Sequence, residues 1–68
     1  MPTMNSQLTH REREVLSLLA AGHTDRKIAE SLMISPRTVN KHMSKIFVKL
    51  DVPGRVAAAT HAVRNGLL

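Results

Sequence analysis

The sequence contains no cysteine and only one aromatic residue, Phe47. Without cysteine the chain cannot form disulfides, thiolate metal sites or a thiol nucleophile, and its composition fits a reducing compartment. With a single aromatic ring, binding by base stacking is not expected. No apolar run approaches the roughly 18 residues of a membrane span, and the N-terminus lacks the pattern of a signal peptide. We therefore expect a cytoplasmic protein with no membrane contact.

The chain is also short, at 68 residues. A protein of this size buries only about 60 % of the surface that its unfolded chain exposes, so its core must be built from local contacts. Residues 1–7 carry proline, asparagine and serine without hydrophobic periodicity, which predicts a flexible lead-in or the end of a linker. Residues 8–68 are then left for one folded domain.

Positive charge is concentrated in the second half of the sequence. The net charge is +5. Residues 1–34 contain four basic and four acidic side chains, whereas residues 35–68 contain six basic and one acidic. Four of these basic residues follow each other at a spacing of four: Arg37, Lys41, Lys45 and Lys49. On a helix this spacing forms one slowly winding stripe, which is either a solvated face or a surface for a polyanion.

The local signals predict an all-α, compact domain of four helices. Thr9 and Glu12 form a capping box ahead of the first apolar run. Thr24 is placed to cap a second, short helix, and Ser35 followed by Pro36 favours the start of a third. An alanine-rich segment beyond the next connector forms the fourth helix. The predicted helices cover residues 10–21, 25–32, 36–50 and 55–65.

The third predicted helix has two different faces. At about 100° per residue, its apolar side chains fall in one narrow sector: Val39, Met43, Ile46 and Leu50. Polar side chains fall on the opposite side: Arg37, Asn40, Lys41, Ser44 and Lys45. Val48 falls among the lysines, and the sequence assigns it no function. One face of this helix is therefore predicted to pack and the other to stay open.

The second and third helices together predict a central helix-turn-helix. The two helices are joined by a turn of about three to four residues, and the second has an open face of basic and amide side chains. This is the layout of a DNA-binding helix-turn-helix. The major groove of B-form DNA admits one helix, and Asn, Lys, Arg and Ser side chains can hydrogen-bond to base edges there. Met33 stands in the turn where many such motifs have glycine, at a position that favours a positive φ.

No enzyme site can be assembled from the sequence. It offers no Ser/His/Asp arrangement, no paired carboxylates and no phosphate-binding loop. The four histidines, at positions 10, 23, 42 and 61, lack metal-ligand spacing. We expect no catalysis, no metal, no cofactor and no small-molecule ligand.

Characteristic residues of one known family are spread over all four predicted helices and both connectors. They are Leu8–Leu16, Ile28, Ala29, Leu32, Ile34, Ser35, Thr38, Val39, His42, Ile46, Lys49, Leu50, Arg55, Ala58, Ala62 and Gly66–Leu68. In these residues the sequence resembles the LuxR-type (GerE-like) domain of bacterial transcription regulators, over about residues 8–68.

The resemblance implies a DNA-binding domain that recognises specific double-stranded sequences. It places helix 36–50 in the major groove and gives helix 55–65 a role in forming a homodimer. Family members usually carry this domain at the C-terminus, behind a receiver or signal-binding domain, so we expect an output domain without its input. The expected partners are double-stranded DNA and a second copy of the chain, with RNA polymerase as a further candidate.

The resemblance also implies individual DNA contacts. Base contacts are expected from Asn40, Lys41 and Ser44, and the basic stripe adds Lys45. Phosphate contacts are expected from Thr24, Lys27 and Lys49, and the first turn of the third helix adds Arg37 and Thr38. The family more often has Lys or Arg at position 40. Asn40 therefore indicates a different base preference, and adenine is the natural partner of an amide.

Other residues are expected to serve the fold. Glu12 completes the first cap, His42 lies half-buried or beside a phosphate, and Arg55 bridges the third and fourth helices. Gly54 stands where the family often has serine, so the fourth helix has a weaker cap. Three residues of that helix are expected in the core: Val56, Ala59 and Val63.

Two other functions remain open. The chain could be a stand-alone protein-interaction module that forms heterodimers with larger regulators and inhibits them, in which case it need not bind DNA. It could also be a domain like region four of a sigma factor, which shares the two-helix reader. The helix at 55–65 argues against the second alternative, because that element belongs to the LuxR-type arrangement.

Overall fold

The structure, a computed structural model, describes residues 8–66. It contains four helices: α1 (His10–Ala20), α2 (Asp25–Leu32), α3 (Pro36–Leu50) and α4 (Arg55–Arg64). The described part of the chain has no strand, and the all-α prediction is confirmed. The bounds of α2 and α3 are those predicted, while α1 and α4 each end one residue earlier. The predicted lead-in at residues 1–7 lies outside the described residues.

Side-chain caps explain where three of the helices begin. The Oγ1 atom of Thr9 accepts a hydrogen bond from the Glu12 amide at 3.1 Å, and Glu12 Oε1 accepts one from the Thr9 amide at 2.9 Å. This reciprocal pair is the predicted capping box. Thr24 and Ser35 cap α2 and α3 through one bond each, in which the side chain accepts from the backbone amide three residues later. Gly54 makes no side-chain cap bond, so α4 has the weaker start that the sequence predicts.

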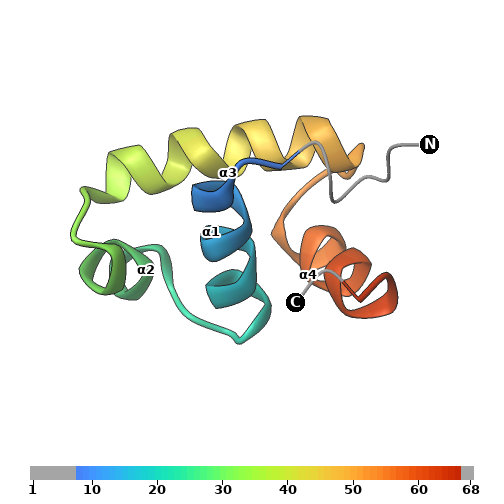
Figure 1. Ribbon diagram of the computed structural model, residues 1–68, viewed down its shortest axis with the longest axis horizontal. Helices are drawn as coiled ribbons and strands as arrows, with labels where there is room; N and C mark the ends of the chain where they lie inside the picture. The colour runs from blue at the N-terminus through green and yellow to red at the C-terminus, as the bar shows by residue number, and fades with distance from the viewer. Residues whose placement is uncertain (1–7, 67–68) are drawn as a thin grey trace.

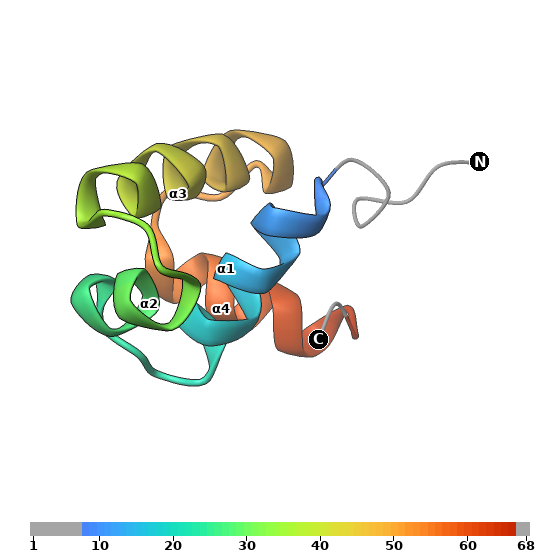
Figure 2. The same cartoon turned by 60° about the vertical axis from the view of Figure 1, so that its left-hand side comes forward.

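The helices pack in a compact arrangement around α1. In Figure 1, α3 runs along the top of the molecule, α1 stands beneath it, and α2 and α4 lie on either side of α1. The turned view of Figure 2 shows the same arrangement, with α3 above the other three helices. Both α1 and α3 pack against every other helix. The second and third helices form the helix-turn-helix, and α1 and α4 support it.

The core draws on all four helices. Leu16, Ile28, Val39 and Ile46 expose none of their surface. The complete buried apolar set is Leu8, Val15, Leu16, Leu19, Ile28, Ala29, Val39, Met43, Ile46, Leu50, Ala58 and Ala62. All four apolar residues predicted for the packing face of α3 belong to this buried set, so the prediction of that face is confirmed.

The core contribution of α4 differs from the prediction. Its buried residues are Ala58 and Ala62, whereas Val56 and Val63 are 78 % and 65 % exposed and Ala59 is half-buried. The prediction that Val56, Ala59 and Val63 form the core side of this helix is therefore wrong. The two buried alanines are four residues apart, on one face of the helix. Their small side chains let α4 pack directly against α1, and the larger valines are left outside.

The turn between α2 and α3 has the conformation expected for a helix-turn-helix. Met33 adopts φ 58° and ψ 43°, the left-handed region that favours glycine, and its side chain is 92 % exposed. Its amide donates to carbonyl oxygens of α2 and so ends that helix. A non-glycine residue in this region costs about 1 kcal/mol. The turn geometry is thus formed in spite of the residue that occupies it.

Candidate nucleic-acid interface

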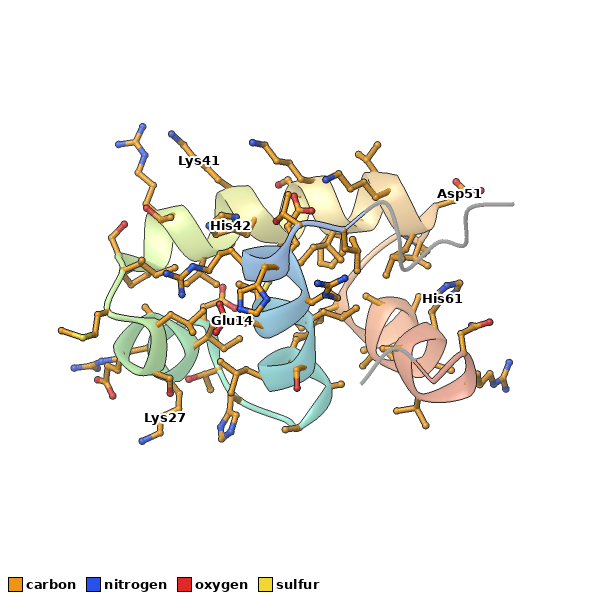
Figure 3. The ribbon with its side chains drawn as sticks, in the orientation of Figure 1. Glu14, Lys27, Lys41, His42, Asp51 and His61 are labelled. Carbon is orange, nitrogen blue, oxygen red and sulfur yellow. The ribbon has the colours of Figure 1, made fainter. Side chains whose placement is uncertain are left out.

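The outer face of α3 carries a row of exposed polar and basic side chains. Five of the predicted contact residues are exposed there: Arg37, Asn40, Lys41, Ser44 and Lys45. Figure 3 shows Lys41 pointing away from the other helices, above the ribbon of α3. The opposite face of the helix is buried against the core, so the row is held on a fixed support. The structure therefore brings all four predicted base-contacting residues onto one surface.

The first turn of α3 combines a cap with a cation. The Oγ atom of Ser35 accepts from the Thr38 amide at 3.1 Å, and the hydroxyl groups of these two residues lie 3.0 Å apart. Thr38 is half-buried, while Arg37 is exposed beside it. The guanidinium of Arg37 lies at the positive end of the helix dipole, which is unfavourable in isolation. An anion at this helix N-terminus would relieve that repulsion.

Asn40 makes a local hydrogen bond within α3. Its Nδ2 atom donates to the carbonyl oxygen of Pro36 at 3.0 Å. A side-chain amide nitrogen carries two hydrogens, and the amide also has an acceptor oxygen. This single bond therefore orients the amide and leaves a second donor and the acceptor for another group.

Lys27, one of the two residues predicted at the start of α2, does not share a surface with the basic row of α3. The Oγ1 atom of Thr24 accepts from the Lys27 amide at 3.1 Å, and both side chains are exposed. In Figure 3 Lys27 points away from α3, to the opposite side of the molecule from Lys41. The structure thus brings together the residues predicted to contact bases but separates Lys27 from them.

Lys49 and Glu12 form an ion pair between α3 and α1. The Nζ atom of Lys49 lies 2.6 Å from Glu12 Oε1, and the Glu12 side chain is 3 % exposed. Burial by itself raises the pKa of the Glu12 carboxyl. The hydrogen bond from Lys49, the bond from the Thr9 amide and the lysine charge outweigh burial and leave this pKa below its ordinary value. Glu12 thus completes the cap, as predicted, and also neutralises much of the Lys49 charge, which the sequence did not reveal.

Arg55 forms a second ion pair, with a partner that the sequence did not indicate. Its guanidinium bonds to the carboxylate of Asp25 at the start of α2, and Nη2 lies 3.6 Å from Met43 Sδ on α3. The predicted bridge from α4 to α3 exists only as this contact with sulfur. The charged contact joins α4 to α2 instead, because Asp25 is the acidic group that the fold places beside Arg55.

Further observations concern the chain outside the basic row. His42 is half-buried, in agreement with the prediction. Among residues 8–66, no three His, Asp or Glu side chains form a group that could hold a metal ion. None of the helices in this part of the chain is long and apolar enough to cross a membrane.

Known proteins share both this sequence pattern and this fold. Residues 6–62 match the family described as GerE, bacterial regulatory proteins of the luxR family. The solved structure of the transcription factor GerE superposes with a TM-score of 0.82 and 37 % identity, over 98 % of this chain and 96 % of that one.

Two relatives are much longer than this chain. The transcriptional regulatory protein LiaR of Bacillus subtilis is 45 % identical over 64 residues, which are 94 % of this chain and 30 % of LiaR. The transcriptional activator protein SolR of Ralstonia solanacearum is 41 % identical over 68 residues, which are 100 % of this chain and 29 % of SolR. The chain thus spans less than a third of either relative. By its match over residues 6–62 and its fold, this chain belongs to the luxR family of bacterial regulatory proteins.

Proposed function

We propose that the domain binds specific sequences of double-stranded DNA with α3 in the major groove. The observation that carries this proposal is the exposed basic and amide row on the outer face of α3, opposite a buried apolar face. A helix of this width fits the groove, and the cations of the row complement the phosphates on either side. Membership of the luxR family favours this function over that of a sigma-factor domain.

Base reading falls to the residues in the middle of the row: Asn40, Lys41, Ser44 and Lys45. The free donor and acceptor of the Asn40 amide match the N7 and N6 groups of adenine. Lys41 and Lys45 donate to acceptors such as those of guanine, and the Ser44 hydroxyl serves either kind of base. We infer that Asn40 selects adenine while the lysines provide most of the affinity.

Phosphate contacts position the helix in the groove. Arg37 and Thr38, at the N-terminus of α3, meet a phosphate where the helix dipole and the guanidinium both favour an anion. The hydroxyl of Thr24 accepts a bond from the backbone and keeps its hydrogen for a phosphate. Lys49 has a weaker part because its charge is shared with Glu12. Lys27 contributes least, since it points away from α3.

Dimer formation through α4 is the second part of the proposal. The outer side of this helix exposes Val56 and Val63, with the half-buried Ala59 between them. Positions i, i+3 and i+7 form one apolar stripe on a helix. A second copy that covers this stripe would present two copies of α3 to two half-sites, as dimeric helix-turn-helix proteins do. RNA polymerase remains a further candidate partner.

The test is a selection of bound duplexes from a random pool, followed by affinity measurements on the selected site. Lys41→Ala should weaken binding by a factor of about ten or more, and Asn40→Ala should relax the preference at one base pair. Arg26→Ala is the matched control, because Arg26 is an exposed cation of α2 that pairs with Glu30 and is not among the predicted contact residues. The logarithm of the affinity should fall with the logarithm of salt concentration, by about 0.9 per neutralised phosphate.

Binding that is equal for all duplexes, or independent of salt, would contradict the proposal. A protein that retards no duplex but forms a complex with a larger luxR-type regulator would instead be the inhibitory interaction module. Equal losses for Lys41→Ala and Arg26→Ala would show that the charge acts without regard to position, and α3 would not be the reading helix.

A further inference from the structure

We propose that Val48 reads the 5-methyl group of a thymine in the DNA site. The inference rests on the proposed function, because it requires α3 to lie in the major groove. Val48 is 80 % exposed, whereas the other valine, isoleucine, leucine and methionine residues of α3 are buried. It therefore stands outside the core, on the side of the helix that carries the basic row.

The position of Val48 along α3 gives it a base pair of its own. It follows Lys41 by seven residues, which is close to two helical turns, so the two side chains lie on nearly the same line along the helix. Two turns advance about 10 Å along the axis, and stacked base pairs are about 3.4 Å apart. Val48 thus lies far enough along α3 to face a different base pair from the one that Lys41 reads.

The side chains around Val48 form a shallow apolar hollow. Together with Ser44, Lys45 and Lys49, Val48 lines this hollow, whose exposed surface is entirely apolar. Glu12 holds the Lys49 ammonium at 2.6 Å, so the charge of Lys49 is drawn toward α1 and its methylene stem is left beside the hollow. The surface inside the hollow is apolar, and the polar groups of Ser44 and Lys45 remain available for the neighbouring bases. The hollow fits a methyl group, and the thymine methyl is the apolar group on the edges of the bases in the major groove.

The charge around the hollow indicates that its occupant is part of a nucleic acid. Lys41 and Lys45 are exposed on the same side of α3 and extend the basic row to the edge of the hollow. A DNA duplex offers phosphates to these cations and also thymine methyl groups to the hollow. The hollow is also continuous with the proposed DNA interface. An apolar side chain of a partner protein would instead need acidic neighbours to match the lysines.

Replacement of thymine by deoxyuridine provides a test that removes only the methyl group. Each thymine of the selected duplex is replaced in turn, and affinities are measured for the wild-type domain and for Val48→Ala. At one thymine we expect about a fourfold loss of affinity with the wild type, the value for one buried methyl group, and no loss with Val48→Ala. Selection with Val48→Ala should relax the preference at that same base pair. Val48→Thr, which keeps one methyl group, should show an intermediate loss.

Met33→Ala is the control, since Met33 is 92 % exposed and lies outside α3. This variant should keep the sensitivity of the wild type to deoxyuridine, and the salt dependence should be the same in all variants. The proposal is overturned if no replacement weakens wild-type binding or if Val48→Ala shows the same loss. It is also overturned if Val48→Ala changes self-association and leaves thymine sensitivity intact. If no duplex is selected at all, the proposed function fails, and this inference fails with it.

Discussion

The helices α3 and α4 differ in how much of their stability comes from their own residues. A cap bond from Ser35 and a proline at the first position start α3, and a row of large buried side chains holds it to the core. Gly54 starts α4 without a side-chain cap, and only Ala58 and Ala62 are buried. Helix α3 is therefore specified by its own residues and anchored by large buried side chains. Helix α4 depends on close packing against α1 and on contacts with distant residues.

The ion pairs of the two helices repeat this contrast. Lys49 joins the end of α3 to Glu12, whose side chain is 3 % exposed. Arg55 joins the start of α4 to Asp25, and these side chains are 46 % and 28 % exposed. An ion pair open to water contributes little, because solvent competes for both charges. The ion pair of the proposed recognition helix is thus the less exposed of the two, and α4 keeps an apolar outer side for a second copy.

The largest expected effect separates the buried face of α3 from the outer side of α4. Ile46→Ala in α3 should lower the free energy of unfolding by about 3 kcal/mol, because it leaves a cavity at a fully buried position. Val63→Ala in α4 should change it by less than about 0.5 kcal/mol, since that valine is exposed. Urea unfolding followed by circular dichroism measures both. Similar losses in the two variants would mean that α4 packs more deeply than described.

The next effect concerns the buried ion pair of α3. Glu12→Gln should cost about 2 kcal/mol at neutral pH, because the amide binds the Lys49 ammonium less strongly and completes a weaker cap. The pKa of Glu12 is lower in the folded protein than its ordinary value of 4.5. The stabilisation is therefore complete above the unfolded pKa and is lost as the pH falls through the folded pKa.

Unfolding measured between about pH 3 and 7 tests the linkage of Glu12 to stability. The wild type should lose stability at the acidic end, and Glu12→Gln should give a flatter profile. Glu14→Gln is the control, since Glu14 makes only longer ion pairs on the surface of α1, at 3.5 and 3.9 Å. A Glu12→Gln profile parallel to that of the wild type would assign the acid sensitivity to other carboxylates.

The next pair of variants removes the side-chain cap of α3 and adds one to α4. Ser35→Ala should cost about 1 kcal/mol through loss of the cap bond to the Thr38 amide. Gly54→Ser should gain a few tenths of a kcal/mol, because a serine side chain can accept from the first turn of α4. The backbone at Gly54 is extended and no atom lies within 4 Å of an added Cβ, so serine fits there. Thermal unfolding compares the two, and a loss of stability in Gly54→Ser would contradict this account of α4.

The smallest effect is expected at the exposed ion pair of α4. Asp25→Asn should lower stability by roughly 0.5 kcal/mol or less, and this loss should diminish at high salt. Denaturant unfolding at low and high ionic strength measures it. A loss as large as that of Glu12→Gln would remove the distinction between the two ion pairs.

Much of the fold was predictable because its signals are local. Caps, proline and the spacing of apolar residues gave the bounds of α2 and α3, and they separated the buried face of α3 from its open face. The residues predicted to contact bases came from the family resemblance and from the basic stripe, and the structure places them on one exposed face of α3. The buried side of α4 was not predictable in this way. Its alanines and valines are all apolar, so periodicity does not say which of them face α1.

What the sequence by itself determined is therefore the set of helices, their caps and the two faces of α3. These depend on interactions within about four residues along the chain, where spacing alone decides which groups meet. Only the tertiary structure decided that Lys49 pairs with Glu12, 37 residues away, and Arg55 with Asp25, 30 residues away. It also decided that small residues of α4 face inward and that Lys27 points away from α3. Those outcomes depend on how whole helices pack, which no local pattern specifies.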